Sequence, residues 1–153
     1  MMLVLGPVTA VIAAAVRYRA LGTTPEFLAV QFTDMIAFGL LTGAGLLLRG
    51  TPSAHKRLTM LGLIYISGAG FSRFLGPIVA AALGTGPAGE LFALYGLSDL
   101  LILALGAYDL ATRRRLHPAY SAGVALSLAC QAIAVTGLLN PAWKAMSLHI
   151  VGH

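Results

Sequence analysis

The sequence predicts an all-α fold, a polytopic bundle of membrane helices, and three observations lead to that prediction. Hydrophobic residues make up 58% of the 153-residue chain and charged residues only 10%, whereas soluble globular domains contain about 25% charged residues. Long apolar blocks fill most of the sequence, and the ten Lys and Arg residues fall mainly between them. A soluble fold is therefore excluded. The excess of positive charge fits the positive-inside rule for membrane proteins, so it does not indicate nucleic-acid binding.

Five apolar blocks match the length of roughly 17 to 25 residues that a helix needs to cross the hydrocarbon core of a bilayer. We predict five spans within a single transmembrane domain, at residues 1–16, 27–48, 58–83, 91–111 and 119–139. The first block has no Lys or Arg before its apolar stretch, which favours a membrane helix over a cleaved signal peptide.

The third block is too long for one straight span, and it contains Gly76 and Pro77. Proline is common in the first turn of a helix, where its missing N–H costs no hydrogen bond. We therefore predict that the third helix is interrupted near residue 76 and that a new helical turn begins at Pro77.

The distribution of basic residues predicts the orientation of the chain. The connectors at residues 49–57 and 112–118 hold six Lys or Arg residues, more than the connectors on the opposite side. The positive-inside rule then places these two loops and the N-terminus in the cytoplasm and the C-terminus outside the cell membrane. Arg17 and Arg19 oppose this orientation, because they would face outward.

Three charged residues inside the predicted spans form the main candidate site, an intramembrane polar cluster of Asp34, Arg73 and Asp99. An ionised side chain at the centre of a membrane helix costs about 2.5 to 3.5 kcal/mol, so such residues usually pair or line a polar cavity. The topology puts all three at a similar depth, and Gln31 shares the helical stripe of Asp34. We predict that Arg73 pairs with Asp34, Asp99 or both. The pairing either fixes helix register or contributes to activity.

Small residues precede Arg73 on one stripe of the third span, at Gly62, Ala69 and Gly70. Because small residues allow membrane helices to approach closely, we expect this stripe to contact another helix. The same contact would carry Arg73 into the bundle.

Asp109 lies near the cytoplasmic end of the fourth span, four residues before Arg113. Side chains at this spacing are neighbours on a helix surface, and an Asp–Arg pair there is favourable. We predict an Asp109–Arg113 pair with a structural role at the membrane interface.

The two basic loops contain the candidate metal ligands His55 and His117. Both histidines would lie at the cytoplasmic interface, so a shared metal or haem site is one interpretation. The favoured alternative places His55, beside Lys56 and Arg57, at a helix start or in contact with phosphate groups, because basic loops attract anionic lipid head groups. Cys130, the only cysteine, lies in an apolar block and is expected to be a core residue.

The run Ala54-His55-Lys56-Arg57-Leu58-Thr59-Met60, with Asp34 in the span before it and Arg73 in the span after it, resembles a family of uncharacterised bacterial integral membrane proteins. The resemblance covers roughly residues 30–120 and rests on His55, Lys56, Arg57, Arg73, Asp99, Asp109, His117 and Pro118. Thr59 stands where an apolar residue is expected. The resemblance implies a helical bundle in the bacterial inner membrane, and it implies no particular activity.

Three functions are consistent with these observations. The first, which we favour, is a non-enzymatic accessory or assembly protein in which Arg73 and the aspartates hold helices together. The second is a small proton-coupled transporter that uses the intramembrane aspartates. The third is a redox protein with haem or a metal at His55 and His117. The expected partners are the lipid bilayer and either a homo-oligomer or another membrane subunit, with no nucleic acid.

Overall fold

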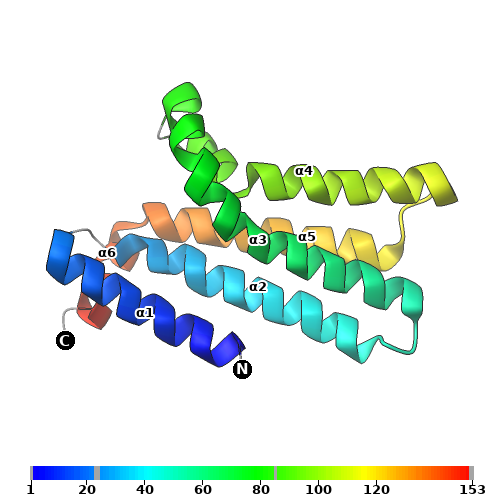
Figure 1. The fold of residues 1–153 in the computed structure, drawn as a ribbon, viewed down its shortest axis with the longest axis horizontal. Coiled ribbons are helices and arrows are strands. Elements are labelled where there is room, and N and C mark those ends of the chain that lie inside the picture. The colour runs from blue at the N-terminus through cyan, green and yellow to red at the C-terminus, as the bar shows by residue number, and fades with distance from the viewer. Residues whose placement is uncertain (1, 23–24, 85, 152–153) are drawn as a thin grey trace. The chain divides into compact units, whose positions relative to one another are not determined.

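The structure is a computed structural model that describes residues 2–22, 25–84 and 86–151. Six α-helices and one short 3-10 helix follow one another in the described part of the chain (Figure 1). They are α1 (Met2–Leu21), η1 (Pro25–Phe27), α2 (Leu28–Leu47), α3 (Pro52–Leu83), α4 (Pro87–Arg113), α5 (Pro118–Leu139) and α6 (Pro141–Val151). The described residues contain no β-strand, so the predicted all-α fold is confirmed.

Among the described residues, four helical segments are long and apolar enough to cross a membrane, and they match four of the five predicted spans. They run over Pro25–Leu47, Pro52–Leu83, Leu91–Arg113 and Pro118–Leu139. The chain is therefore a multi-pass membrane protein. The first predicted span, at residues 1–16, overlaps α1 from Met2 onward, and residue 1 lies outside the described residues; α1 is not among these four. A fifth span stays a prediction.

Proline marks the start of the last four helices. Pro52, Pro87, Pro118 and Pro141 are the first residues of α3, α4, α5 and α6. At this position the fixed φ of proline suits the helix, and the missing N–H would have no helical partner in any case. The boundaries of these helices are therefore encoded locally in the sequence.

The predicted interruption of the third helix near residue 76 is wrong. α3 is continuous over the 32 residues from Pro52 to Leu83, with Pro77 inside it. An interior proline removes one backbone hydrogen bond and crowds the carbonyl of the residue four positions earlier, which kinks a helix. Figure 1 shows α3 changing direction in its C-terminal part. α3 ends only at Gly84, which has a φ of 78° and whose N–H bonds to the carbonyl of Ala80 at 2.9 Å.

The chain forms two compact units. The first comprises Met1–Ile36 and Cys130–His153, and the second comprises Ala37–Ala129. In the first unit, the indole N–H of Trp143 donates to the carbonyl of Glu26 at 3.0 Å, and Nζ of Lys144 lies 2.6 Å from Oε1 of Glu26. These contacts join α6 to η1. The single transmembrane domain expected from the sequence stays a prediction.

Aromatic side chains mark the packed interior of the second unit. Tyr65 of α3 and Tyr95 of α4 are both buried, with ring centroids 5.7 Å apart. The hydroxyl of Tyr120 in α5 donates to the carbonyl of Ile102 in α4 at 2.8 Å. Leu61, four residues before Tyr65 on α3, is also fully buried. These contacts pack α3 against α4, and α4 against the start of α5.

Large apolar side chains remain on the outside of the spans. Leu47, Phe74 and Ile78 are 87%, 81% and 65% exposed. Several polar side chains, in contrast, are buried, among them Asp34 and Asp109. A soluble protein rarely exposes so much apolar surface, whereas lipid tails solvate it without cost. The distribution of polarity therefore agrees with the membrane assignment.

Candidate functional site

A buried ion pair between α3 and α4 is the best-defined polar feature of the second unit. Arg57 lies near the start of α3, and Asp109 lies near the end of α4. Nε of Arg57 donates to Oδ2 of Asp109 at 2.6 Å, and Nη2 of Arg57 donates to Oδ1. This is the bidentate arrangement that gives arginine–carboxylate pairs their strength and fixed geometry. The side chains of Arg57 and Asp109 are 9% and 1% exposed, so the ion pair is buried in the protein interior.

The structure corrects the predicted partner of Asp109. The sequence predicted Arg113, one helical turn further along α4, but both carboxylate oxygens are bound by Arg57. Arg113, in contrast, is exposed. Arg57, on the facing helix α3, is the partner because its guanidinium reaches both carboxylate oxygens within the packed interior.

Ser53 extends the ion pair by one step. Its carbonyl, in the first turn of α3, accepts a hydrogen bond from Nη1 of Arg57 at 2.7 Å. The hydrogen bonds donated by Nε, Nη1 and Nη2 of Arg57 therefore end on two residues, Asp109 and Ser53. The arginine is held at one end of α3 by its own helix and by α4.

His117 connects the start of α5 to α3. Its Nδ1 accepts the backbone N–H of Ala119 at 3.1 Å, which satisfies one of the free amides of the first turn of α5. A neutral ring whose Nδ1 accepts a hydrogen bond carries its proton on Nε2. Nε2 then donates to Oγ of Ser53, 3.2 Å away. In this tautomer the hydrogen bond links the start of α5 to the first turn of α3.

His55 satisfies the C-terminal end of α2. The N–H of Arg49 bonds to the carbonyl of Leu46, which leaves the carbonyl of Gly45 without a partner from its own helix. Nδ1 of His55 donates to this carbonyl at 2.8 Å. The last carbonyls of a helix need such external donors. His55 itself lies in the first turn of α3, near a helix start as one interpretation expected, but its side chain caps the C-terminal end of the preceding helix, α2.

Two glycines and two threonines bring α2 and α3 close together beside this contact. A Cβ on Gly45 would lie 2.8 Å from Oγ1 of Thr59, and a Cβ on Gly62 would lie 2.7 Å from Oγ1 of Thr42. Each glycine therefore faces a threonine of the other helix, with no room for a side chain. The predicted helix contact of the small-residue stripe is confirmed at Gly62. It does not extend to Gly70, where no described atom lies within 4 Å of a Cβ position.

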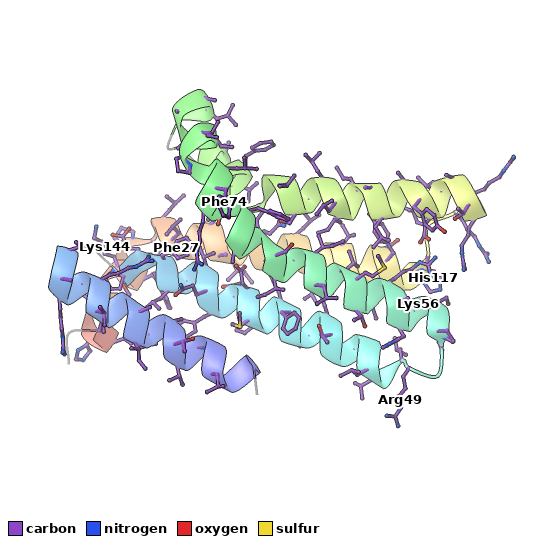
Figure 2. The ribbon with its side chains drawn as sticks, viewed as in Figure 1. Phe27, Arg49, Lys56, Phe74, His117 and Lys144 are labelled. Carbon is purple, nitrogen blue, oxygen red and sulfur yellow. The ribbon has the colours of Figure 1, made fainter. Side chains whose placement is uncertain are left out.

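These contacts gather at one end of the second unit. We call Ser53, Arg57, Asp109 and His117 the polar network; it joins α3, α4 and the start of α5. Five exposed basic residues lie in the same two connecting regions, and we call them the cationic rim: Arg49, Lys56, Arg113, Arg114 and Arg115. Figure 2 shows Arg49, Lys56 and His117 at the same end of this unit.

The members of the predicted intramembrane cluster lie in different surroundings. In the first unit, Asp34 is 4% exposed and Gln31 is half-buried. In the second unit, Asp99 is half-buried and Arg73 is exposed. Within that unit, α3 therefore does not carry Arg73 into the packed interior, as the small-residue stripe suggested. The pairing of Arg73 with the two aspartates stays a prediction.

The candidate metal ligands contact different groups. Nδ1 of His55 and Nδ1 of His117 each bond to the backbone, at Gly45 and at Ala119 respectively. Among the residues that the structure describes, no group of three or more His, Cys, Asp or Glu side chains is placed to hold a metal ion. The haem or metal site stays a prediction. Cys130 is buried in the first unit, as expected for a core residue.

Sequence reasoning missed the buried role of Arg57. By composition alone, Arg57 belongs with Lys56 to a basic loop, yet α3 already begins at Pro52. The signal was a helical stripe that starts before the apolar block: Ala54, Arg57, Leu61 and Tyr65 recur every three or four residues, and all are buried. A charged residue on such a stripe must meet a counter-charge.

The chain matches no protein-family model, no curated protein and no solved structure. Its function is therefore inferred from the described residues and their contacts.

Proposed function

We propose that the chain is a non-enzymatic accessory or assembly subunit of a membrane protein complex. The observation that carries this proposal is that the polar network satisfies itself. Arg57 directs Nε, Nη1 and Nη2 at Asp109 and Ser53, and His117 uses both ring nitrogens within the fold. A reacting site needs a nucleophile, acid or base directed at a substrate. The hydrogen bonds of these side chains instead hold helices together.

The C-terminal part of α3 supports a role in assembly. Phe74 and Ile78 are mostly exposed, and no described atom lies within 4 Å of a Cβ built on Gly70 or Gly76. Membrane helices associate through close packing at small residues next to larger apolar ones. This part of α3 therefore offers a surface for a helix of another membrane subunit.

We further propose a bacterial inner membrane as the location, with the cationic rim in the cytoplasm. The resemblance in residues 30–120 supports the first statement, and the positive-inside rule supports the second. Single cysteines at Arg49 and at Lys144, introduced into a Cys130→Ser background, test the orientation in intact cells. A membrane-impermeant maleimide should label the cysteine at 144 and not that at 49. The opposite pattern would reverse the orientation.

The mass of the assembly in native membranes tests the proposed function. The full chain, carrying an affinity tag, is extracted into polymer nanodiscs and weighed by native mass spectrometry. We expect a defined complex well above the 15.8 kDa of one chain. A lone 15.8 kDa chain in every mild extraction would refute the assembly role.

A matched pair of variants locates the contact. Gly70→Leu, on the C-terminal part of α3, should reduce the fraction of chain in the complex. Gly43→Leu, on α2, is the control, because Gly43 also has no described atom within 4 Å of its Cβ position. Equal loss in both variants, or loss in neither, would remove α3 as the contact surface.

A proton-coupled transporter is the second candidate, and the burial of Asp34 at 4% exposure favours it. Buried ionisable residues in membrane helices often mark proton pathways. Asp34→Asn should then abolish pH-driven proton flux in proteoliposomes while leaving folding intact. Equal flux in the wild-type chain, the variant and protein-free liposomes would exclude this candidate.

A further inference from the structure

We propose that the cationic rim binds the phosphate head groups of anionic phospholipids. The rim consists of Arg49, Lys56, Arg113, Arg114 and Arg115, all exposed. This binding surface is separate from the subunit contact proposed for α3, and it does not depend on that contact.

The polar network brings the two halves of the rim to one place. Arg49 and Lys56 flank the start of α3, whereas the three consecutive arginines begin at the last residue of α4. The Arg57–Asp109 pair ties these two regions together, and the Ser53–His117 hydrogen bond ties them a second time. Regions about 60 positions apart in the sequence therefore meet at one end of the second unit, where Figure 2 labels Arg49, Lys56 and His117.

The positive charge of the rim has no internal counter-charge in these regions. Asp109 is the only acidic residue within residues 45–60 and 105–120, and both of its oxygens are bound by Arg57. That pair is neutral as a unit. The five rim residues thus leave a surface with five positive charges, which requires an anionic partner or counter-ions from solution.

Exposed leucines beside the rim identify lipid as the partner. Leu46 and Leu47 precede Arg49 and are 58% and 87% exposed, and Leu110 and Leu116 flank the three arginines at 49% and 42% exposed. Cations next to exposed apolar side chains at the end of a membrane helix meet both parts of a phospholipid. The leucines contact the acyl chains, and the basic groups reach the phosphates at the membrane surface. Since the leucines at the ends of the spans contact acyl chains, the head groups of the same lipids are the anions nearest to the rim.

The end of α4 distributes its arginines around the surface. Arg114 has a left-handed backbone with a φ of 55°, and its N–H bonds to the carbonyl of Leu110 at 2.9 Å. The helix therefore stops after Arg113, and the next two arginines leave the helical path. The three arginines are therefore not confined to one helical path.

Native mass spectrometry of the purified, detergent-solubilised full chain tests this proposal. The chain is titrated separately with phosphatidylglycerol, with phosphatidylcholine and with inorganic phosphate. We expect phosphatidylglycerol to bind in preference to phosphatidylcholine, and more weakly as the salt concentration rises. Lys56→Gln together with Arg115→Gln should weaken phosphatidylglycerol binding by about 25-fold, because each basic residue contributes about fivefold.

Two control variants complete the experiment. Arg17→Gln with Arg19→Gln removes the same charge from exposed positions of α1 and should change binding less than about twofold, whereas Lys56→Arg with Arg115→Lys should retain it. Equal affinity for the two lipids, or equal losses in the rim and α1 variants, would overturn the proposal. Displacement of phosphatidylglycerol by inorganic phosphate at equal concentration would also overturn it, since the surface would then bind free phosphate rather than lipid.

Discussion

Removing the charge of Asp109 tests the polar network most directly. Asp109→Asn nearly preserves the shape of the side chain, but it leaves the guanidinium of Arg57, only 9% exposed, without a counter-charge. Breaking a buried ion pair from one side costs about 3 to 5 kcal/mol. Because Arg57 keeps its hydrogen bond to the carbonyl of Ser53, we expect a loss near the lower limit, about 3 kcal/mol.

The double variant separates the charge effect from packing. Arg57→Met with Asp109→Leu replaces both charges by apolar side chains of similar size. Such replacements are often neutral or stabilising, so we expect the free energy of unfolding to stay within about 1 kcal/mol of the wild-type value. The losses measured for the matching single variants, Arg57→Met and Asp109→Leu, should therefore be strongly non-additive, with a coupling of about 3 kcal/mol or more.

Reversible unfolding in mixed micelles of increasing dodecyl sulfate content, followed by far-UV circular dichroism, measures these free energies. Arg113→Gln is the control, because this exposed arginine is not a direct partner of Asp109, and its loss should cost less than about 1 kcal/mol. The reasoning fails if Asp109→Asn and Arg113→Gln cost the same. It also fails if the double variant loses the sum of the two single losses.

The other contacts at this end of the second unit give three further predictions. Gly62→Ala should lower the free energy of unfolding by about 1 to 3 kcal/mol through overpacking. Gly70→Ala, in open space, should leave this free energy unchanged or raise it by about 0.5 to 1 kcal/mol. The same melting temperature for both variants would contradict the close contact at Gly62. His55→Ala should cost about 1 to 2 kcal/mol because the carbonyl of Gly45 loses its donor, and an unchanged unfolding curve would argue against this role. His117→Ala should speed hydrogen exchange at the amide of residue 119, whereas His117→Asn should restore protection as a helix-capping residue.

The spans could be predicted because the hydrocarbon core of the bilayer requires mostly apolar side chains along the whole length of a span. Apolar block length determined four helices, and Pro87 and Pro118 mark helix starts within one to four residues of the predicted bounds. Pro77 misled the prediction for a physical reason. A proline can begin a helix or bend one, and only the hydrogen bonding of the neighbouring turns distinguishes the two.

The partners of polar residues were harder to predict than their presence. Asp109 stood out as an anomalous charge, but its sequence neighbour Arg113 was the only partner that helix periodicity could offer. The observed partner, Arg57, lies 52 residues away, and a single sequence contains no information on which helices face each other. The reciprocal contacts of Gly45 and Gly62 with threonines were missed for the same reason.

During synthesis, Arg57 is made well before its counter-charge. Asp109 follows 52 residues later, a delay of roughly 3 to 10 s at about 5 to 20 residues per second. In that interval α2 and α3 can already pair through Gly45, Gly62 and the cap from His55, because all of these residues have been made. Arg57 lies near the start of α3 and can stay hydrated at the membrane surface until α4 arrives. At the middle of a span it would have to enter lipid alone, at about 2.5 to 3.5 kcal/mol, so the location of the pair suits the order in which the chain is built.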